Sequence, residues 1–202
     1  MWLVSDVHEL AAIKEIEQAS DRAIGIVAGA IIASKLSDVL RRALGDESPY
    51  AKKVRNQMFE HEGPLGTFAA HINMAYLIGL LSEKGHGDLQ TFKKVRNLFA
   101  HYAEHNTFDT ERIKALCKNF RLIDEELRVH DQVIFKRDTP EEKFEIPVDA
   151  VVIERGLVTL GIKKAGDNTA SPKWRFLTSS KLFCATLDRY LEKPQELVLP
   201  LL

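Results

Sequence analysis

The residues best suited to chemistry lie in one short segment, 93–101, which reads KKVRNLFAH. Lys93, Lys94 and Arg96 form a local basic cluster that could contact phosphate. An arginine can hold the charge that develops on phosphorus, and a histidine side chain titrates near neutral pH and can move a proton. Arg96 and His101 together therefore have the residue types that metal-free RNA cleavage requires.

Helical geometry limits how these side chains can cooperate. On an ideal helix Arg96 and His101 point about 140° apart, whereas Asn97 and His101 share a face. A phosphate site that uses Arg96 and His101 would need a distorted helix end, or a second copy facing the first across a two-fold axis. A structural role also fits: Arg96 would pair with a carboxylate, Asn97 would satisfy a loop backbone, and His101 would terminate the helix. The residues alone leave both interpretations open.

Metal and nucleotide chemistry have little support in the sequence. His101 and His105 have the spacing of two ligands on one helix face, but no third ligand is fixed by the sequence. The chain has no phosphate-cradling glycine loop, Walker lysine, nucleophile elbow or HExxH motif. Its two cysteines, Cys117 and Cys184, are too few for a disulfide framework or a four-thiolate zinc site. We expect no metal and no cofactor.

The composition is that of an ordinary globular protein: 202 residues, 45% hydrophobic, with 28 Lys+Arg against 29 Asp+Glu. This length suits one domain over 1–202. The balanced charge argues against binding to nucleic acid through the electrostatic field of the whole protein. Asp6 and Glu9 stand where a secretory signal would be basic, so we expect a cytoplasmic protein. The most apolar stretch, 23–33, is too short to span a bilayer, which predicts a buried helix and no membrane contact.

Helices must position the 93–101 segment. Apolar periodicity predicts a mainly α protein, a multi-helix bundle with its helical core over 6–124 and a closing helix over 172–191. Residues that favour helix starts precede the expected helices: Asp6, Ser48 with Pro49, Thr67, Ser82, and Ser171 with Pro172. Asn106, Thr107 and Asp109 precede another helix, expected over about 110–120. The pattern does not decide whether the first stretch, which ends at Gly45, is one long helix or two with a break near Ser20.

A stripe of small residues runs along the first predicted helix. Gly25, Gly29 and Ala33 recur every fourth residue, which places them on one face. Because each glycine costs about 1 kcal/mol in a helix relative to alanine, the stripe indicates close approach of a second backbone. That backbone would belong to another core helix of the chain or to a dimer mate.

The composition changes after Leu127. Residues 129–135 and 148–162 are rich in Val and Ile and lack helical caps, and prolines and glycines interrupt them. We therefore predict a small β-rich or irregular insert over 128–169, before the last helix.

Several motifs of this chain, in this order, resemble those of the mannitol operon repressor (MtlR) family. They are Asp21-Arg22, Met58-Phe59, Glu62-Gly63-Pro64-Leu65-Gly66, Ala75-Tyr76, Gly79-Leu80-Leu81, Asp88-Leu89, Lys94-Val95-Arg96-Asn97 and Phe99-Ala100-His101. The resemblance covers about 20–120, and its most specific feature is the Gly63–Gly66 turn at a fixed distance before the Arg96–His101 helix. It implies an all-helical, often dimeric bacterial repressor of transcription. We expect these two motifs to have a structural role, in positioning helices or an interface. The insert over 128–169 departs from it.

A second, shorter resemblance concerns one helix. Arg96, Asn97 and His101 match the arginine, polar residue, three residues, histidine signature of HEPN domains. These are helical, dimerising domains, and many are metal-independent ribonucleases. The resemblance implies Arg96 as phosphate clamp, Asn97 as orienting residue and His101 as acid and base.

Together these observations favour a homodimeric transcriptional regulator that is not an enzyme. No pair of short helices joined by a tight glycine turn with a basic second helix is visible, so we expect no helix-turn-helix. Such a regulator would touch DNA through a non-standard surface or act through a protein partner. A HEPN-like ribonuclease and a protein-binding adaptor are the alternatives.

Overall fold

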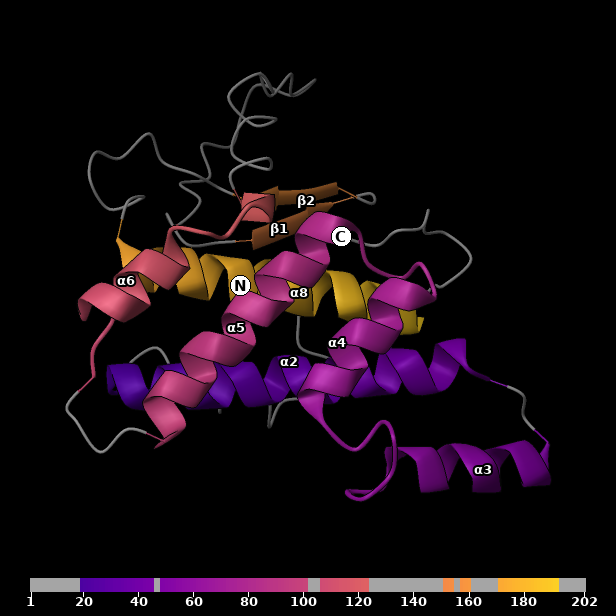
Figure 1. Ribbon diagram of the computed structural model, residues 1–202. Helices are drawn as coiled ribbons and strands as arrows, with labels where there is room; N and C mark the ends of the chain where they lie inside the picture. Colours follow the sequence, from indigo (N-terminus) through magenta and orange to yellow (C-terminus); the bar gives the residue numbers. More distant parts are fainter. Residues whose placement is uncertain are drawn as a thin grey trace, which may run out of the picture.

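The computed structural model describes residues 19–45, 48–101, 106–123, 151–154, 157–160 and 171–192. In this part the chain is mainly helical, which confirms the principal element of the predicted fold class. The described helices are α2 (Asp21–Ala43), α3 (Pro49–Phe59), α4 (Phe68–Leu77), α5 (Glu83–His101), α6 (Glu111–Cys117) and α8 (Pro172–Glu192) (Figure 1).

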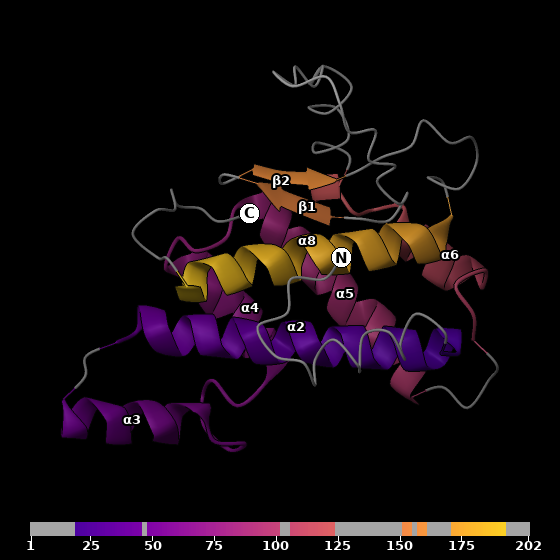
Figure 2. The ribbon, with the colours of Figure 1, turned by 180° about the vertical axis from the view of Figure 1, so that it is seen from behind.

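The helices form a bundle with two layers (Figures 1 and 2). α2 and α8 run side by side in one layer, and α4 and α5 cross α2 from the other. α6 contacts both α5 and α8 at one end of the bundle. α3 stands apart from this bundle and buries none of its residues.

Local capping chemistry begins five of the described helices, four of them at the predicted caps and α2 at Ser20, whereas Thr110 before α6 makes no side-chain capping bond. Five side-chain oxygens each accept a hydrogen bond from the backbone N–H three residues later: those of Ser20, Ser48, Thr67, Ser82 and Ser171. α2 itself begins at Asp21, directly after the Ser20 cap. The start predicted at Asp6 lies outside the described residues.

A cluster of phenylalanines holds α5 against α8. Phe92 of α5 is fully buried, and its ring centroid lies 4.7 Å from that of Phe120, 4.9 Å from Phe176 and 5.5 Å from Phe183. Burying one such side chain contributes roughly 1.5–3 kcal/mol, and tilted or edge-on ring pairs add to this. This cluster fixes the position of the helix that carries the 93–101 segment.

α2 is the one helix in the described part of the chain that is long and apolar enough to cross a membrane. Its apolar residues Ile24, Ile32 and Leu36 are fully buried within the bundle, which is the behaviour of a core helix. Lys35 of α2 is also buried, and its Nζ lies 2.6 Å from a carboxylate oxygen of Asp188 in α8. Such a pair fixes the register of the two helices, because separating the charges inside a protein is costly.

The predicted β-rich insert over 128–169 is not supported. β1 (Val151–Glu154) and β2 (Leu157–Leu160) form one antiparallel pair, and the rest of the segment lies outside the described residues. Two strands of four residues are too few for an independently stable sheet. The predicted closing helix is α8, and the division of the chain into core, insert and closing helix stays a prediction.

Candidate functional site

The 93–101 segment forms the C-terminal half of α5, and its side chains divide between two faces. Arg96 and Phe99 lie against α2, whereas Lys94, Asn97 and His101 line a groove between α5 and α6. A regular helix produces this division. Residues three or four positions apart share a face of the helix, whereas Arg96 and His101 are five positions apart and do not. One chain therefore does not bring Arg96 and His101 together.

Two glycines of α2 admit the side chains of α5. A Cβ atom at Gly25 would overlap the ring of Phe99, and one at Gly29 would lie 2.8 Å from Cδ of Arg96. The two glycines of the small-residue stripe thus pack against another helix of the same chain. This is the first of the two partners that the spacing predicted. Arg96 is half-buried, and in the described part of the chain its buried Nε has no hydrogen-bond partner. The predicted carboxylate partner of Arg96 is not found there.

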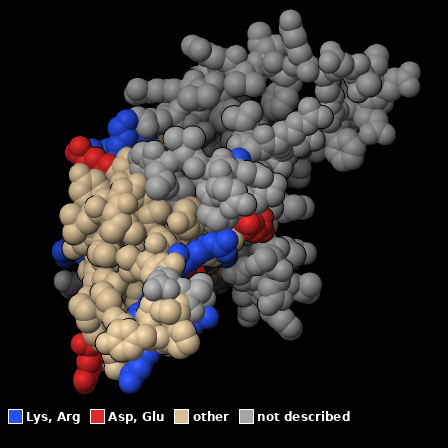
Figure 3. All heavy atoms as spheres, turned by 90° about the vertical axis from the view of Figure 1, so that its right-hand side faces the viewer, with Lys and Arg blue, Asp and Glu red and all other residues tan. Residues whose placement is uncertain are grey.

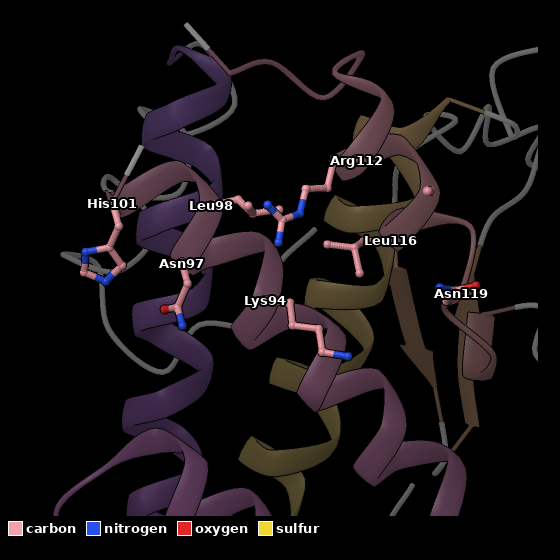
Figure 4. A pocket seen from close by; sticks show the side chains of 8 residues that line it. Lys94, Asn97, Leu98, His101, Arg112, Leu116 and Asn119 are labelled. Carbon is pink, nitrogen blue, oxygen red and sulfur yellow. The ribbon is translucent and has the colours of Figure 1, made fainter. Parts of the chain in front are cut away.

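The opposite face of α5 borders the groove, which has a volume of about 690 Å³. α5 contributes Lys94, Asn97, Leu98 and His101, and the α6 side contributes Arg112, Ala115, Leu116 and Asn119 (Figure 4). Lys94 and Arg112 extend into the space between the two helices, whereas the ring of His101 points away from them. His101 is exposed and is the last residue of α5, as predicted. His105 lies outside the described residues.

Sequence reasoning identified one of the two cations in this groove. Of the predicted phosphate contacts Lys93, Lys94 and Arg96, only Lys94 lines the groove. Arg112 was missed, because it belongs to a short helix whose position beside α5 is fixed only by the packed core. One feature of the sequence could have pointed to Arg112: it is a cation in the first turn of the helix that follows the basic segment.

The Gly63–Gly66 turn reverses the chain between α3 and α4. Leu65 N–H donates to the carbonyl of Met58 at 2.8 Å, so the turn folds back on the end of α3. A Cβ at Gly63 would overlap the carbonyl oxygen of Gln57, and Gly66 stands in a similarly close position. At both positions the backbone lies so close to carbonyl oxygens that any side chain would collide with them, so the turn requires glycine.

His71 of α4 fastens this turn to the bundle. Its Nε2 donates to the carbonyl of Leu65 at 2.7 Å, which fixes the neutral tautomer, and its buried Nδ1 has no partner in the described part of the chain. Burial lowers the pKa of His71, the hydrogen bond to Leu65 opposes this change, and the charge of Arg41 adds to it. The ring also packs against Phe59, with centroids 5.3 Å apart.

Asp88 of α5 is a second buried polar anchor that the sequence did not single out as one. It is fully buried, and its carboxylate accepts hydrogen bonds from the backbone N–H groups of Arg121 and Leu122 at 2.9 to 3.1 Å. Burial raises the pKa of Asp88, and the hydrogen bonds partly offset this rise. Asp88 therefore holds the segment after α6 against α5.

Nucleophilic and metal chemistry are not favoured at the described residues. Cys117 and Cys184 are buried and form no disulfide, and burial raises the pKa of Cys117 to about 12. Among the described residues no group of three or more His, Cys, Asp or Glu side chains could hold a metal ion. Basic and acidic residues are interspersed on the face shown in Figure 3, without a large patch of one sign.

These features define the class of protein: a helical bundle in which a glycine-rich turn and an Arg-Asn-x-Phe-Ala-His helix are packed into fixed positions. The family model described as MtlR, mannitol repressor, matches residues 9–149, and the chain belongs to this family. The matched range is longer than the range of about 20–120 over which the motifs resemble the family. It includes part of the expected insert and ends before α8. Searches of curated proteins and of solved structures returned no match.

Proposed function

We propose that this protein is a negative regulator of transcription of the mannitol-repressor type, cytoplasmic and bacterial, and not an enzyme. The observation that carries the proposal is the family match, which covers residues 9–149 of 202. The α-helical bundle agrees with a regulatory module whose core helices hold each other in place.

Regulation through a protein partner fits the described helices better than direct reading of DNA. α4 and α5 meet at a corner where Gly79 has a φ of 77°, so they are the best placed pair for a helix-turn-helix. α5 would then be the reading helix, but it is packed against α2, α4 and α6, and α6 borders its polar face with Lys94 and Asn97. A recognition helix must lay an open, polar face in the major groove. The proposed regulator therefore acts as a protein-binding module.

A homodimer is part of this proposal, and α3 supports it. This helix of 11 residues buries none of its side chains and exposes Tyr50 and Val54, which lie four residues apart on one face. Helices of this length are marginal in water unless another surface covers them. A second copy of the chain is the partner that we propose for this face.

The ribonuclease alternative has weaker support. It needs Arg96 and His101 at one phosphate, and in one chain they lie on different faces of α5. The Arg96 side chain packs along Gly29 of α2, so only its far end could reach an RNA. A site assembled across a dimer axis is the remaining form of this hypothesis.

The proposal is tested with a reporter gene under the mannitol operon promoter of the source organism. We expect the expressed chain to lower reporter output severalfold, and a scrambled promoter to be unaffected. An unchanged reporter would contradict the repressor function. In gel-shift measurements the purified protein should bind the same promoter DNA weakly, with affinity falling steeply between about 50 and 200 mM salt. Tight, sequence-selective binding would contradict action through a protein partner.

A further inference from the structure

His71 is buried in α4, and only one of its two ring nitrogens has a hydrogen-bond partner in the described part of the chain. Nε2 donates to the carbonyl of Leu65 at 2.7 Å, whereas Nδ1 is buried and has no partner there. A neutral ring tolerates this arrangement, because an Nδ1 without a proton needs no acceptor. A protonated ring has an N–H donor at both nitrogens, and the second donor would be buried without an acceptor.

The surroundings of the ring also oppose a positive charge. The guanidinium carbon of Arg41 in α2 lies 4.2 Å from the centroid of the Phe59 ring, and the His71 ring packs against Phe59 at 5.3 Å. The charge of Arg41 lowers the pKa of His71, and no carboxylate of the described residues shifts it. α3 and the turn present only an aromatic ring and a carbonyl to His71. Protonation therefore favours arrangements in which the ring leaves this site.

The same ring holds the end of α3 and the turn that follows it. Phe59 is the last residue of α3, and Leu65 N–H donates to the carbonyl of Met58 at 2.8 Å. His71 thus contacts α3 through Phe59 and the turn through Leu65. α3 buries none of its residues. An element with so little buried surface can open while the rest of the fold stays intact.

We propose that His71 is an acid-sensitive latch, which holds α3 and the following turn on the bundle while its ring is neutral and releases them when the ring is protonated. A histidine freed from the site titrates near pH 6.5, so the released form gains at most about tenfold per pH unit below that value. Because α3 carries the face that we propose for the homodimer, acid would also weaken the dimer. This second consequence rests on the proposed homodimer, and the latch itself does not.

Amide hydrogen exchange of the ¹⁵N-labelled full chain tests the latch at about pH 7.5 and 5.5, with rates corrected for the intrinsic effect of pH. We expect residues 53–59 to be less protected than residues 89–99 of α5 at both pH values, because α3 opens without unfolding of the bundle. Protection of 53–59 should fall at least threefold at the lower pH. Equal protection of the two helices, no measurable protection of 53–59 at pH 7.5, or no fall with acid would overturn the proposal.

Two histidine variants locate the effect. His71→Gln keeps an N–H donor for Leu65 but takes up no proton in this range, so protection of 53–59 should change less than twofold between the two pH values. His61→Gln removes an exposed histidine between α3 and α4 and should keep the full fall with acid. A pH dependence that persists in His71→Gln, or that disappears in His61→Gln, would assign the effect to another group.

The ring ¹⁵N signals of His71 give a measurement on the natural chain that needs no variant. At about pH 6.5, where an ordinary histidine is half-protonated, they should show a neutral ring with its proton on Nε2. A ring that is mostly protonated at this pH would overturn the latch, even if His71→Gln were too unstable to study.

Sedimentation at the same two pH values tests the consequence for the dimer. We expect the dimer dissociation constant to rise at least threefold at pH 5.5 in the natural chain and less than twofold in His71→Gln. An unchanged constant would contradict the link between the latch and the dimer. If the natural chain is a monomer at both pH values, the proposed homodimer fails, and the exchange measurement still decides whether His71 holds α3.

Discussion

Gly25 and Gly29 show how a single missing methyl group can decide the position of a helix. Each occupies a point where α2 and α5 approach so closely that a Cβ atom would enter a side chain of α5. The glycines therefore place Phe99 and Arg96 against α2, and by the geometry of one helix this leaves Lys94 and Asn97 facing α6. The groove depends on two residues that do not touch it.

Alanine substitution of Gly25 should destabilise the fold. The added Cβ would overlap the ring of Phe99, which is fully buried and cannot move without disturbing the core. We expect Gly25→Ala to lower the free energy of unfolding by about 1–3 kcal/mol, as measured by chemical denaturation.

Gly87 offers a matched control in α5, since a Cβ there would meet nothing within 4 Å. Gly87→Ala should raise the free energy of unfolding by about 0.5–1 kcal/mol, because alanine favours the helix. If Gly25→Ala were as stable as Gly87→Ala, the close packing of α2 and α5 would be wrong.

At the scale of elements, the connection from α3 to α4 is held by few but specific contacts. The guanidinium of Arg41 in α2 stacks 4.2 Å from the ring centroid of Phe59, and its Nη1 donates to Asn56 at 3.1 Å. Phe59 in turn packs on His71, whose Nε2 holds the carbonyl of Leu65. The projecting helix α3 is thus anchored at its C-terminal end, through a histidine whose pKa is lowered by burial.

This anchoring predicts a pH dependence of stability. Because burial lowers the pKa of His71, the unfolded chain takes up a proton more readily than the folded chain as the pH falls below about 6.5. The contribution of His71 is complete above that pH and is lost as the pH falls, by at most about 1.4 kcal/mol per pH unit for one proton.

Denaturant unfolding between pH 5.5 and 7.5 measures this effect. His71→Gln retains an N–H donor but does not titrate, so its free energy of unfolding should fall less steeply with acid than that of the natural chain. His61→Gln, which alters an exposed histidine, serves as the reference substitution. Equal slopes for the natural chain and His71→Gln would contradict this role of His71.

At the scale of the whole molecule, the exposed face of α3 is the surface that we propose for the homodimer. Tyr50 is 77% exposed, and Val54 is 37% exposed on the same face of a helix that stands apart from the bundle (Figure 2). Burying such apolar area against a second copy would gain about 25 cal/mol for each Å² removed from water. A two-fold dimer would use the same face of both chains.

Analytical ultracentrifugation tests this arrangement. The natural chain should sediment as a dimer at micromolar concentration, and Tyr50→Ser with Val54→Asp should raise the dimer dissociation constant at least tenfold. Lys52→Ala, a change elsewhere on the same helix, should leave it within a factor of three. A natural chain that sediments as a monomer at 100 µM would contradict the predicted homodimer.

The sequence by itself determined where α3, α4, α5 and α8 begin and to which family the chain belongs. Helix starts are readable because a cap such as Ser48 or Thr67 acts on a backbone N–H three residues away. The family motifs are equally local, and they include the glycines of the turn after α3.

The tertiary structure decided what the basic segment can do. Arg96 packs against Gly29 and Lys94 faces Arg112, because a core of buried aromatic residues sets α2 and α6 on opposite sides of α5. Those partners are far apart in the chain, and no local rule connects them. The same packing buries His71 and Asp88, whose polar roles no spacing in the sequence indicates. Sequence alone could list the cations near position 96, but only long-range packing could divide them between a core contact and an open groove.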